Sequence, residues 1–127
     1  MSTAPEKSLY ERLGGYDAIA AATDDLLQRL TSDPEIGFYW RGHSTDSMKR
    51  DRQLIVDFLC ASIGGPVIYR GRDMKTSHVG LNITEREWEV FVAHTVATLE
   101  HFQVPEPEKQ EFLDCAASLK GEIVEKP

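Results

Sequence analysis

The sequence lacks the long apolar run and the cysteine content that would mark a membrane-spanning or disulfide-rich protein. Its longest uncharged apolar stretch, Phe58 to Tyr69, is broken by Gly64-Gly65-Pro66 and is too short to cross a bilayer. The first seven residues contain no apolar segment of the signal-peptide type. The only two cysteines, Cys60 and Cys115, lie in apolar helical patterns, so we expect buried thiols in a reducing cytoplasm.

Several common functional motifs are also missing. The sequence contains no P-loop, dinucleotide fingerprint, nucleophile elbow or zinc-ligand spacing. It has no internal repeat, no linker and no sustained strand alternation. A length of 127 residues suits one core, and a composition of 41% hydrophobic and 28% charged residues is ordinary for a globular protein. We therefore predict one all-α domain over residues 1–127, with residues 1–7 as a flexible N-terminal tail.

Charge is distributed unevenly along the chain. The net charge of −7 argues against a general nucleic-acid binder. Residues 41–78 nevertheless carry seven basic and four acidic side chains, a local charge of +3. The rest of the chain carries the other seven basic and seventeen acidic side chains, a charge of −10. This basic middle segment is consistent either with ordinary surface charge or with a bound anion.

Apolar residues recur at helical spacing through most of the chain. Ser8 and Thr84 each precede a glutamate by three residues, which is the pattern of a capping box. Glycine pairs and prolines separate the segments. The expected helical segments are 8–13, 16–30, a short turn around 36–40, a long helix from about 45 to 63, 84–99 and 112–123. On the long helix one face is predicted to gather Met48, Asp51, Ile55, Phe58, Leu59 and Ser62.

An irregular loop is expected over residues 64–77, and it leads into a single histidine, His78. Long loops in compact domains are usually functional or disordered. Imidazole is a common ligand of haem iron, zinc and copper. Zinc requires three or four ligands, and no second His or Cys lies within ten residues of His78. A cofactor that needs one protein ligand, such as haem, therefore fits His78 better.

Taken in order, these segments resemble the truncated haemoglobins, with greatest similarity to group I of that family. The matching pieces are residues 9–15, 58–66, 69–75 and 78–84, followed by Trp88. The resemblance covers about residues 8 to 120. It implies a shortened globin, in which a two-over-two helical sandwich encloses haem b.

The resemblance also implies roles for individual residues. His78 matches the proximal iron ligand, and Trp88 matches an aromatic residue on the proximal side. One of Tyr39 and Trp40 matches an aromatic residue that stacks on the porphyrin. The other expected haem-lining residues are Phe58, Tyr69 and Met74. Candidates for pairing with the haem propionates are Arg50, Arg70, Arg72 and Lys75.

The distal side departs from the family pattern. Leu27 stands where a tyrosine often donates a hydrogen bond to bound O2, and Asp51 and Ile55 stand where glutamine is frequent. As aligned, the deep pocket is apolar, which predicts weak O2 retention. A slip of one or two residues over the neighbouring positions Gln53 and Leu54 would bring Gln53 into the pocket instead.

His43, in the lengthened loop before the long helix, is the other possible distal donor. We expect it either to reach the distal face or to stay in solvent. The function expected from the resemblance is binding of O2, CO or NO for transport or sensing, without membrane or nucleic-acid partners. The alternatives are a nitric oxide dioxygenase or peroxidase-like enzyme served by a reductase, and a helical interaction domain without haem.

Overall fold

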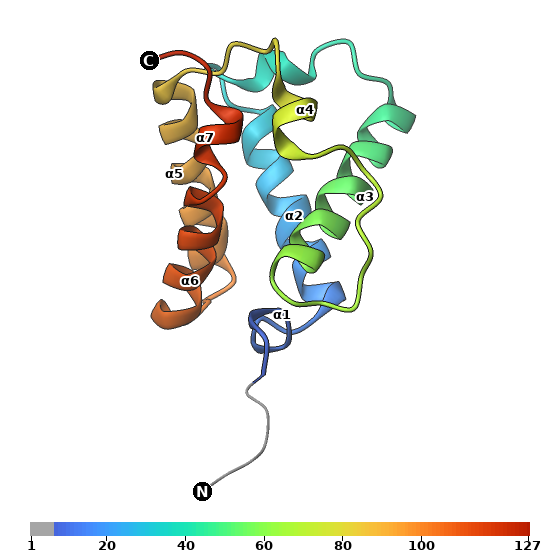
Figure 1. The fold of residues 1–127 in the computed structure, drawn as a ribbon, viewed down its shortest axis with the longest axis vertical. Helices are drawn as coiled ribbons and strands as arrows, with labels where there is room; N and C mark the ends of the chain where they lie inside the picture. The colour runs from blue at the N-terminus through green and yellow to red at the C-terminus, as the bar shows by residue number, and fades with distance from the viewer. Residues whose placement is uncertain (1–6) are drawn as a thin grey trace, which may run out of the picture.

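The computed structural model describes residues 7–127 and is helical almost throughout (Figure 1). The flexible tail expected over residues 1–7 lies outside the described residues except for Lys7. In chain order the elements are α1 (Leu9–Arg12), α2 (Tyr16–Thr31), the 3-10 helix η1 (Gly37–Trp40), α3 (Thr45–Ser62), α4 (Met74–His78), α5 (Glu85–His101), α6 (Glu106–Ala117) and α7 (Lys120–Ile123).

Side-chain caps fix where several helices begin. The Ser8 hydroxyl accepts a hydrogen bond from the Glu11 amide, 3.2 Å away, at the start of α1. At the start of α5 the exchange is reciprocal, because the Thr84 hydroxyl accepts from the Glu87 amide while the Glu87 carboxylate accepts from the Thr84 amide. The capping box predicted at Thr84 is thereby confirmed, and each such cap stabilises its helix by about 1 kcal/mol.

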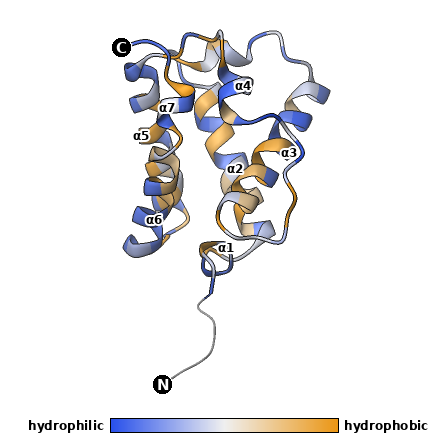
Figure 2. Cartoon of the chain, in the orientation of Figure 1, coloured by the Kyte–Doolittle hydropathy of each residue, from blue (hydrophilic) through white to orange (hydrophobic). Residues whose placement is uncertain are grey.

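The long helices form two layers. Helix α2 packs on α3, α5 packs on α6, and the contact between α2 and α5 joins the two pairs. Figure 1 shows α2 and α3 on one side and α5, α6 and α7 on the other, with α4 at the front. Figure 2 shows apolar segments along α2, α3 and α5. This arrangement agrees with the predicted two-over-two sandwich.

The core consists of two apolar clusters. One surrounds Val56 and Cys60 of α3, which have no exposed area, and includes Leu9 and Ile19. The other joins Leu26 and Leu30 of α2 with Ile36 and Val90. Burial of one such aliphatic side chain contributes roughly 1.5–3 kcal/mol. Cys60 is therefore buried as predicted, whereas Cys115 is only half-buried at the edge of the first cluster.

The fully buried face of α3 is not the face that the sequence pattern predicted. The fully buried residues are Val56 and Cys60, which pack against α2, α1 and neighbouring residues. Ile55 and Phe58, on the predicted face, remain half-buried. Helix α3 thus has two apolar faces, and the protein covers only one of them completely.

The connections also differ in detail from the prediction. The segment expected to be loop up to residue 77 contains the start of α4, and the last predicted helix is divided into α6 and α7 by Ser118 and Leu119. The turn after α3 follows the prediction. Gly64 has a φ of +94°, a backbone angle that side chains disfavour, and a Cβ on Gly65 would meet the Tyr10 ring at 2.6 Å.

Within residues 7–127, none of the helices combines the length and the hydropathy that a bilayer crossing requires.

Candidate functional site

Helix α4 is the element that carries His78. It begins at an aspartate cap, because the Asp73 carboxylate accepts a hydrogen bond from the Thr76 amide at 2.7 Å. This bond also helps to hold the pKa of Asp73 below its usual value. The Asp73-to-Thr76 spacing was the signal for a helix start that the sequence analysis overlooked. Five residues are too few for a hydrophobic period to reveal the helix.

The imidazole of His78 is oriented by its own helix. Its Nδ1 atom lies 2.8 Å from the carbonyl oxygen of Met74 and 2.9 Å from the hydroxyl of Ser77. A carbonyl oxygen only accepts hydrogen bonds. The Nδ1 atom therefore carries a proton and donates a hydrogen bond to the Met74 carbonyl oxygen. In the neutral ring, Nε2 then holds a free lone pair, which is the form that ligates a metal. Among residues 7–127, no hydrogen bond to Nε2 is recorded, and the ring is only half-buried.

A multi-ligand metal centre has no counterpart in the described part of the chain. No group of three or more His, Cys, Asp or Glu side chains there is arranged to hold an ion. The donor set at α4 is therefore one imidazole nitrogen. A single nitrogen donor suits a metal whose other ligands come from a cofactor, as in haem.

Aromatic side chains lie between α3 and the loop that leads to α4. The rings of Phe58 and Tyr69 meet edge to face, with centroids 5.2 Å apart. The hydroxyl of Tyr69 donates a hydrogen bond to the Arg72 carbonyl oxygen, which ties down the loop. Burial raises the pKa of the Tyr69 phenol. The loop is therefore ordered by specific contacts, and two of the predicted haem-lining residues are brought together.

The remaining apolar candidates share incomplete burial. Leu27 on α2, Leu54 and Ile55 on α3 and Met74 on α4 are all half-buried. In contrast, Val56, one residue after Ile55, has no exposed area. Apolar side chains left half-exposed beside a fully packed core are the surface that a large flat apolar group would cover. That these side chains and the His78 nitrogen line one haem site stays a prediction.

The aromatic pair Tyr39-Trp40 comes from η1. Their rings lie 6.4 Å apart at 85°, and both pack against the second core cluster. The Tyr39 hydroxyl donates to the Glu87 carboxylate at 2.9 Å. Burial and this bond raise the pKa of Tyr39 to about 12. Tyr39 thus fastens η1 to the start of α5, and the choice between Tyr39 and Trp40 as the stacking residue stays a prediction.

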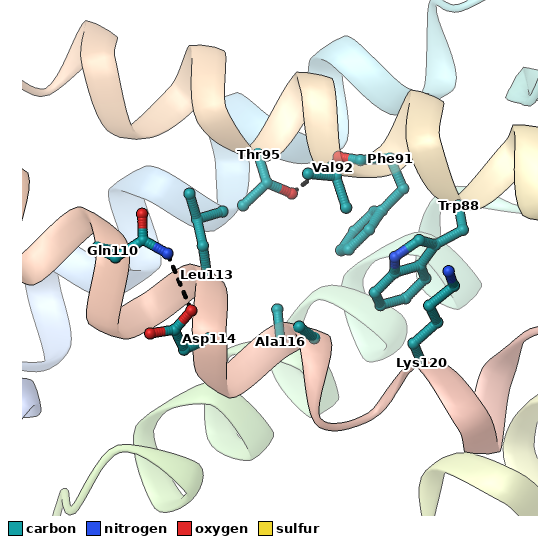
Figure 3. A pocket seen from close by; sticks show the side chains of 10 residues that line it. Trp88, Phe91, Val92, Thr95, Gln110, Leu113, Asp114, Ala116 and Lys120 are labelled. Atoms are coloured by element: carbon teal, nitrogen blue, oxygen red, sulfur yellow. Dashed lines mark hydrogen bonds between the residues drawn. The ribbon is translucent and has the colours of Figure 1, made fainter.

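Trp88 lies at a cavity between α5 and α6. The indole is buried, with 7% of its area exposed, and its centroid is 5.4 Å from that of Phe91. Figure 3 shows Trp88, Phe91 and Val92 projecting from α5 toward α6, where Leu113 lines the opposite wall. The cavity volume is about 360 Å³. His78 is not among its lining residues, so the proximal role of Trp88 stays a prediction.

Exposed cations lie on the segment that leads to His78, on α4 itself and, in the case of Arg50, on α3. Arg50, Arg70, Arg72 and Lys75 are all exposed, and within residues 7–127 none of them forms a recorded ion pair. Arg52, by comparison, is paired with Asp24 through its Nη2 atom at 3.0 Å. These exposed cations are consistent with both interpretations of the basic middle segment, ordinary surface charge and a bound anion.

The polar distal candidates all have partners within the protein. The Gln53 amide is exposed and donates to the Tyr16 hydroxyl at 2.6 Å and to the Asp57 carboxylate at 3.0 Å. The Nδ1 atom of His43 lies 3.3 Å from the carboxylate of Asp51. These contacts do not favour the register in which Gln53 enters the pocket. They attach His43 to the helix that carries Ile55 and Phe58.

Two long-range polar contacts were missed by sequence reasoning. His94 lies on α5 with 25% of its side chain exposed, and its Nε2 atom lies 2.7 Å from the Asp33 carboxylate. That contact is the largest cause lowering the pKa of Asp33. The Glu125 carboxylate accepts hydrogen bonds from the Gly80 and Asn82 amides just after α4. Partners 61 and 43 or more residues apart leave no local signal in a single sequence.

The sequence profile of the bacterial-like globin family matches residues 8–125 of the chain. This span includes α1 to α7 and His78.

Individual relatives agree with this match. The group 1 truncated haemoglobin GlbN of Mycolicibacterium paratuberculosis is 29% identical over 91% of this chain and 83% of its own length. The group 1 truncated haemoglobin GlbN of a Nostoc species is 30% identical over 94% of this chain and 98% of its own length. The crystal structure of truncated haemoglobin from Tetrahymena pyriformis in the Fe(III) form superposes with a TM-score of 0.86 at 23% identity, covering 93% of this chain and 98% of that one.

Proposed function

The chain belongs to the bacterial-like globin family, and from this premise we propose that it holds haem b through His78 and binds O2, CO or NO. We also propose that the whole chain forms one globin domain. Transport or sensing of the gas is the favoured role. The observation that carries the proposal is the His78 ring, whose Nδ1 atom lies 2.8 Å from the Met74 carbonyl oxygen and donates a hydrogen bond to it, so that in the neutral ring Nε2 carries the lone pair that can bind a metal.

When bound, haem supplies the iron that takes up a diatomic gas. The protein supplies the surroundings. His78 offers one nitrogen from the α4 side, and the hydrogen bond to Met74 holds the ring in one orientation. Phe58, Ile55 and Leu27 offer half-buried apolar surface that excludes water from the opposite side.

The propionates of haem are the anions that we assign to the unpaired cations. Arg70, Arg72 and Lys75 flank the approach to α4, and Arg50 lies on α3. Each side chain is exposed, so one such pair contributes roughly 0.2–1 kcal/mol. Several cation–propionate pairs together would orient the porphyrin, but they would contribute only a small part of the affinity of the protein for haem.

Gas retention depends on the distal donors. Leu27 offers no donor where a tyrosine is frequent in the family, and a hydrogen bond to a charged group is worth roughly 1.5–3 kcal/mol. The absence of this hydrogen bond corresponds to an O2 affinity that is tenfold to more than a hundredfold lower. We therefore propose rapid O2 release, which favours transport or sensing over oxidation of nitric oxide.

His43 is the remaining candidate for a distal donor. Its contact with Asp51 supports a position above α3, because Asp51 lies one helical turn before Ile55. The test compares the ferric and ferrous absorption and resonance Raman spectra of His43→Ala with those of the unsubstituted protein. A shift of the ligand-sensitive bands supports His43 as a donor or sixth ligand, and unchanged spectra eliminate that role.

The free thiols support a reducing compartment, and we propose the cytoplasm. Desolvation raises the pKa of both Cys60 and Cys115, so neither is an activated thiolate.

The proposed function is tested by adding hemin to the purified chain and following the Soret band. Stoichiometric uptake is expected, followed by fast O2 dissociation and fast autoxidation in stopped-flow measurements. A chain that stays colourless would instead support a helical interaction domain. Slow O2 dissociation would show that a donor such as His43 or Gln53 reaches the ligand.

A further inference from the structure

The loop that follows His78 has little packing of its own. Val79 is 63% exposed and Leu81 is 45% exposed. Helix α4 spans five residues and contains no fully buried side chain. Neither hydrophobic burial nor helix length therefore fixes the position of this segment. Some other contact has to hold the C-terminal end of α4, where His78 lies.

The chain end supplies that contact. One carboxylate oxygen of Glu125 accepts from the Gly80 amide at 3.2 Å, and the other accepts from the Asn82 amide at 2.9 Å. Gly80 and Asn82 have φ values of +87° and +56°. Left-handed residues of this kind turn neighbouring backbone N–H groups toward one side, where they form a concave anion site. Glu125 fills that site from within the same chain.

Backbone pairing continues the attachment on both sides of Glu125. The amides of Glu125 and Lys126 both donate to the carbonyl oxygen of Ile83, at 2.9 and 3.1 Å. The Glu85 amide donates to the Lys126 carbonyl oxygen at 3.1 Å. Helix α7 packs directly against α4, and Figure 1 shows the end of the chain beside the α4–α5 connection.

We propose that Glu125 is a positioning residue for His78, and that the chain end acts as a strap over the loop after α4. The link is short: the Leu81 amide, between the two amides that Glu125 binds, donates to the His78 carbonyl oxygen at 3.2 Å. Moving the loop therefore moves the backbone that carries the imidazole. The contacts of the strap need no haem, whereas the effect of the strap on His78 as an iron ligand rests on the proposed function.

The strap is tested in the haem-free protein by backbone amide hydrogen exchange. In Glu125→Ala the Gly80 and Asn82 amides lose a charged acceptor, so their exchange is expected to accelerate about tenfold. Glu125→Gln keeps one acceptor oxygen and is expected to restore part of the protection. Glu122→Ala is the matched control, because Glu122 is exposed on α7 and has no recorded side-chain partner within residues 7–127. Unchanged exchange at both amides in Glu125→Ala would overturn the strap.

The positioning role is tested in the haem-loaded protein by the iron–histidine stretching band in ferrous resonance Raman spectra. Glu125→Ala is expected to shift or broaden this band and to speed haem loss several-fold, while Glu125→Gln lies between it and the unsubstituted protein. Faster amide exchange with an unchanged band and unchanged haem loss would overturn the positioning role. If the unsubstituted protein itself shows no iron–histidine band, the proposed function fails, and the exchange result still decides the strap.

Discussion

Ile55 and Val56 are adjacent on α3, yet Val56 has no exposed area and Ile55 is only half-buried. Val56 packs into the core cluster of α1, α2 and α3. Ile55 projects from another face, beside the half-buried Leu54 and Phe58. The difference between these two neighbours shows that the protein covers one side of α3 completely and the other only in part, and we propose that a cofactor covers the second side.

Replacing each of these residues by alanine separates the two faces. Val56→Ala is expected to lower the free energy of unfolding by about 2 kcal/mol whether or not haem is present, since it opens a cavity in the core. Ile55→Ala is expected to cost about 1 kcal/mol in the haem-free protein and clearly more with haem bound. Urea denaturation of both forms measures the costs. An Ile55→Ala cost that is the same with and without haem would contradict a cofactor on that face.

Introducing a donor at Leu27 tests the apolar character of the distal pocket. Leu27→Tyr is expected to slow O2 dissociation tenfold to more than a hundredfold, the effect of one hydrogen bond worth roughly 1.5–3 kcal/mol. Leu27→Phe, which adds the ring without the hydroxyl, is the control and is expected to leave the rate within a few-fold of the original. Stopped-flow replacement of O2 by CO gives both rates. Equal rates for the two variants would place Leu27 outside the pocket.

The unpaired cations near α4 predict a salt-sensitive contribution to haem retention. Removing Arg72 and Lys75 together, as Arg72→Ala with Lys75→Ala, is expected to accelerate haem loss by about two- to fivefold per residue at low salt, the range of an exposed ion pair. The effect is expected to shrink as ionic strength rises. Haem transfer to an excess of a competing apoprotein measures the rate, and Lys7→Ala serves as the control. A loss rate that does not respond to these substitutions would argue against propionate contacts there.

Tyr39 predicts a change in stability at alkaline pH. Burial and the bond to Glu87 raise its pKa from 10.0 to about 12. The folded protein therefore retains the phenol proton more strongly than the unfolded chain, so this contribution to stability is complete below pH 10 and is lost between pH 10 and about 12. Near-ultraviolet titration should show a late-ionising component that loses the equivalent of one tyrosine in Tyr39→Phe, while Tyr69, whose pKa is also raised, contributes in both proteins. A late component of unchanged amplitude in the variant would contradict the assignment.

Local sequence signals were sufficient to predict most of the helices. Periodic apolar residues identified α2, α3 and α5, and the Thr84–Glu87 capping box marked the start of α5. Helix α4 was not predicted, because its five residues span less than two helical turns and show no apolar period.

The fully buried face of α3 was not predicted either, for a different reason. Periodicity reveals where apolar side chains lie around a helix, but not whether protein or a cofactor covers them.

The site prediction rests mainly on the ordered resemblance that ends at His78, and the residues assigned to the site stay predictions. The hydrogen bond from His78 to Met74 follows from a four-residue separation within α4, but only once that helix is known. The contacts of Asp33 with His94 and of Glu125 with Asn82 depend on how the layers and the chain end are arranged in three dimensions. Periodicity and short motifs carry no information about such distant pairs.

The most direct test of the account is the absorption spectrum of the His78→Gly variant after addition of hemin, recorded with and without free imidazole. The account predicts that the Soret band of the unsubstituted protein is lost or strongly shifted, and that imidazole, which can occupy the space of the missing side chain, restores it. A variant that binds hemin with the original spectrum, and does not respond to imidazole, would contradict the assignment of residue 78 as the iron ligand.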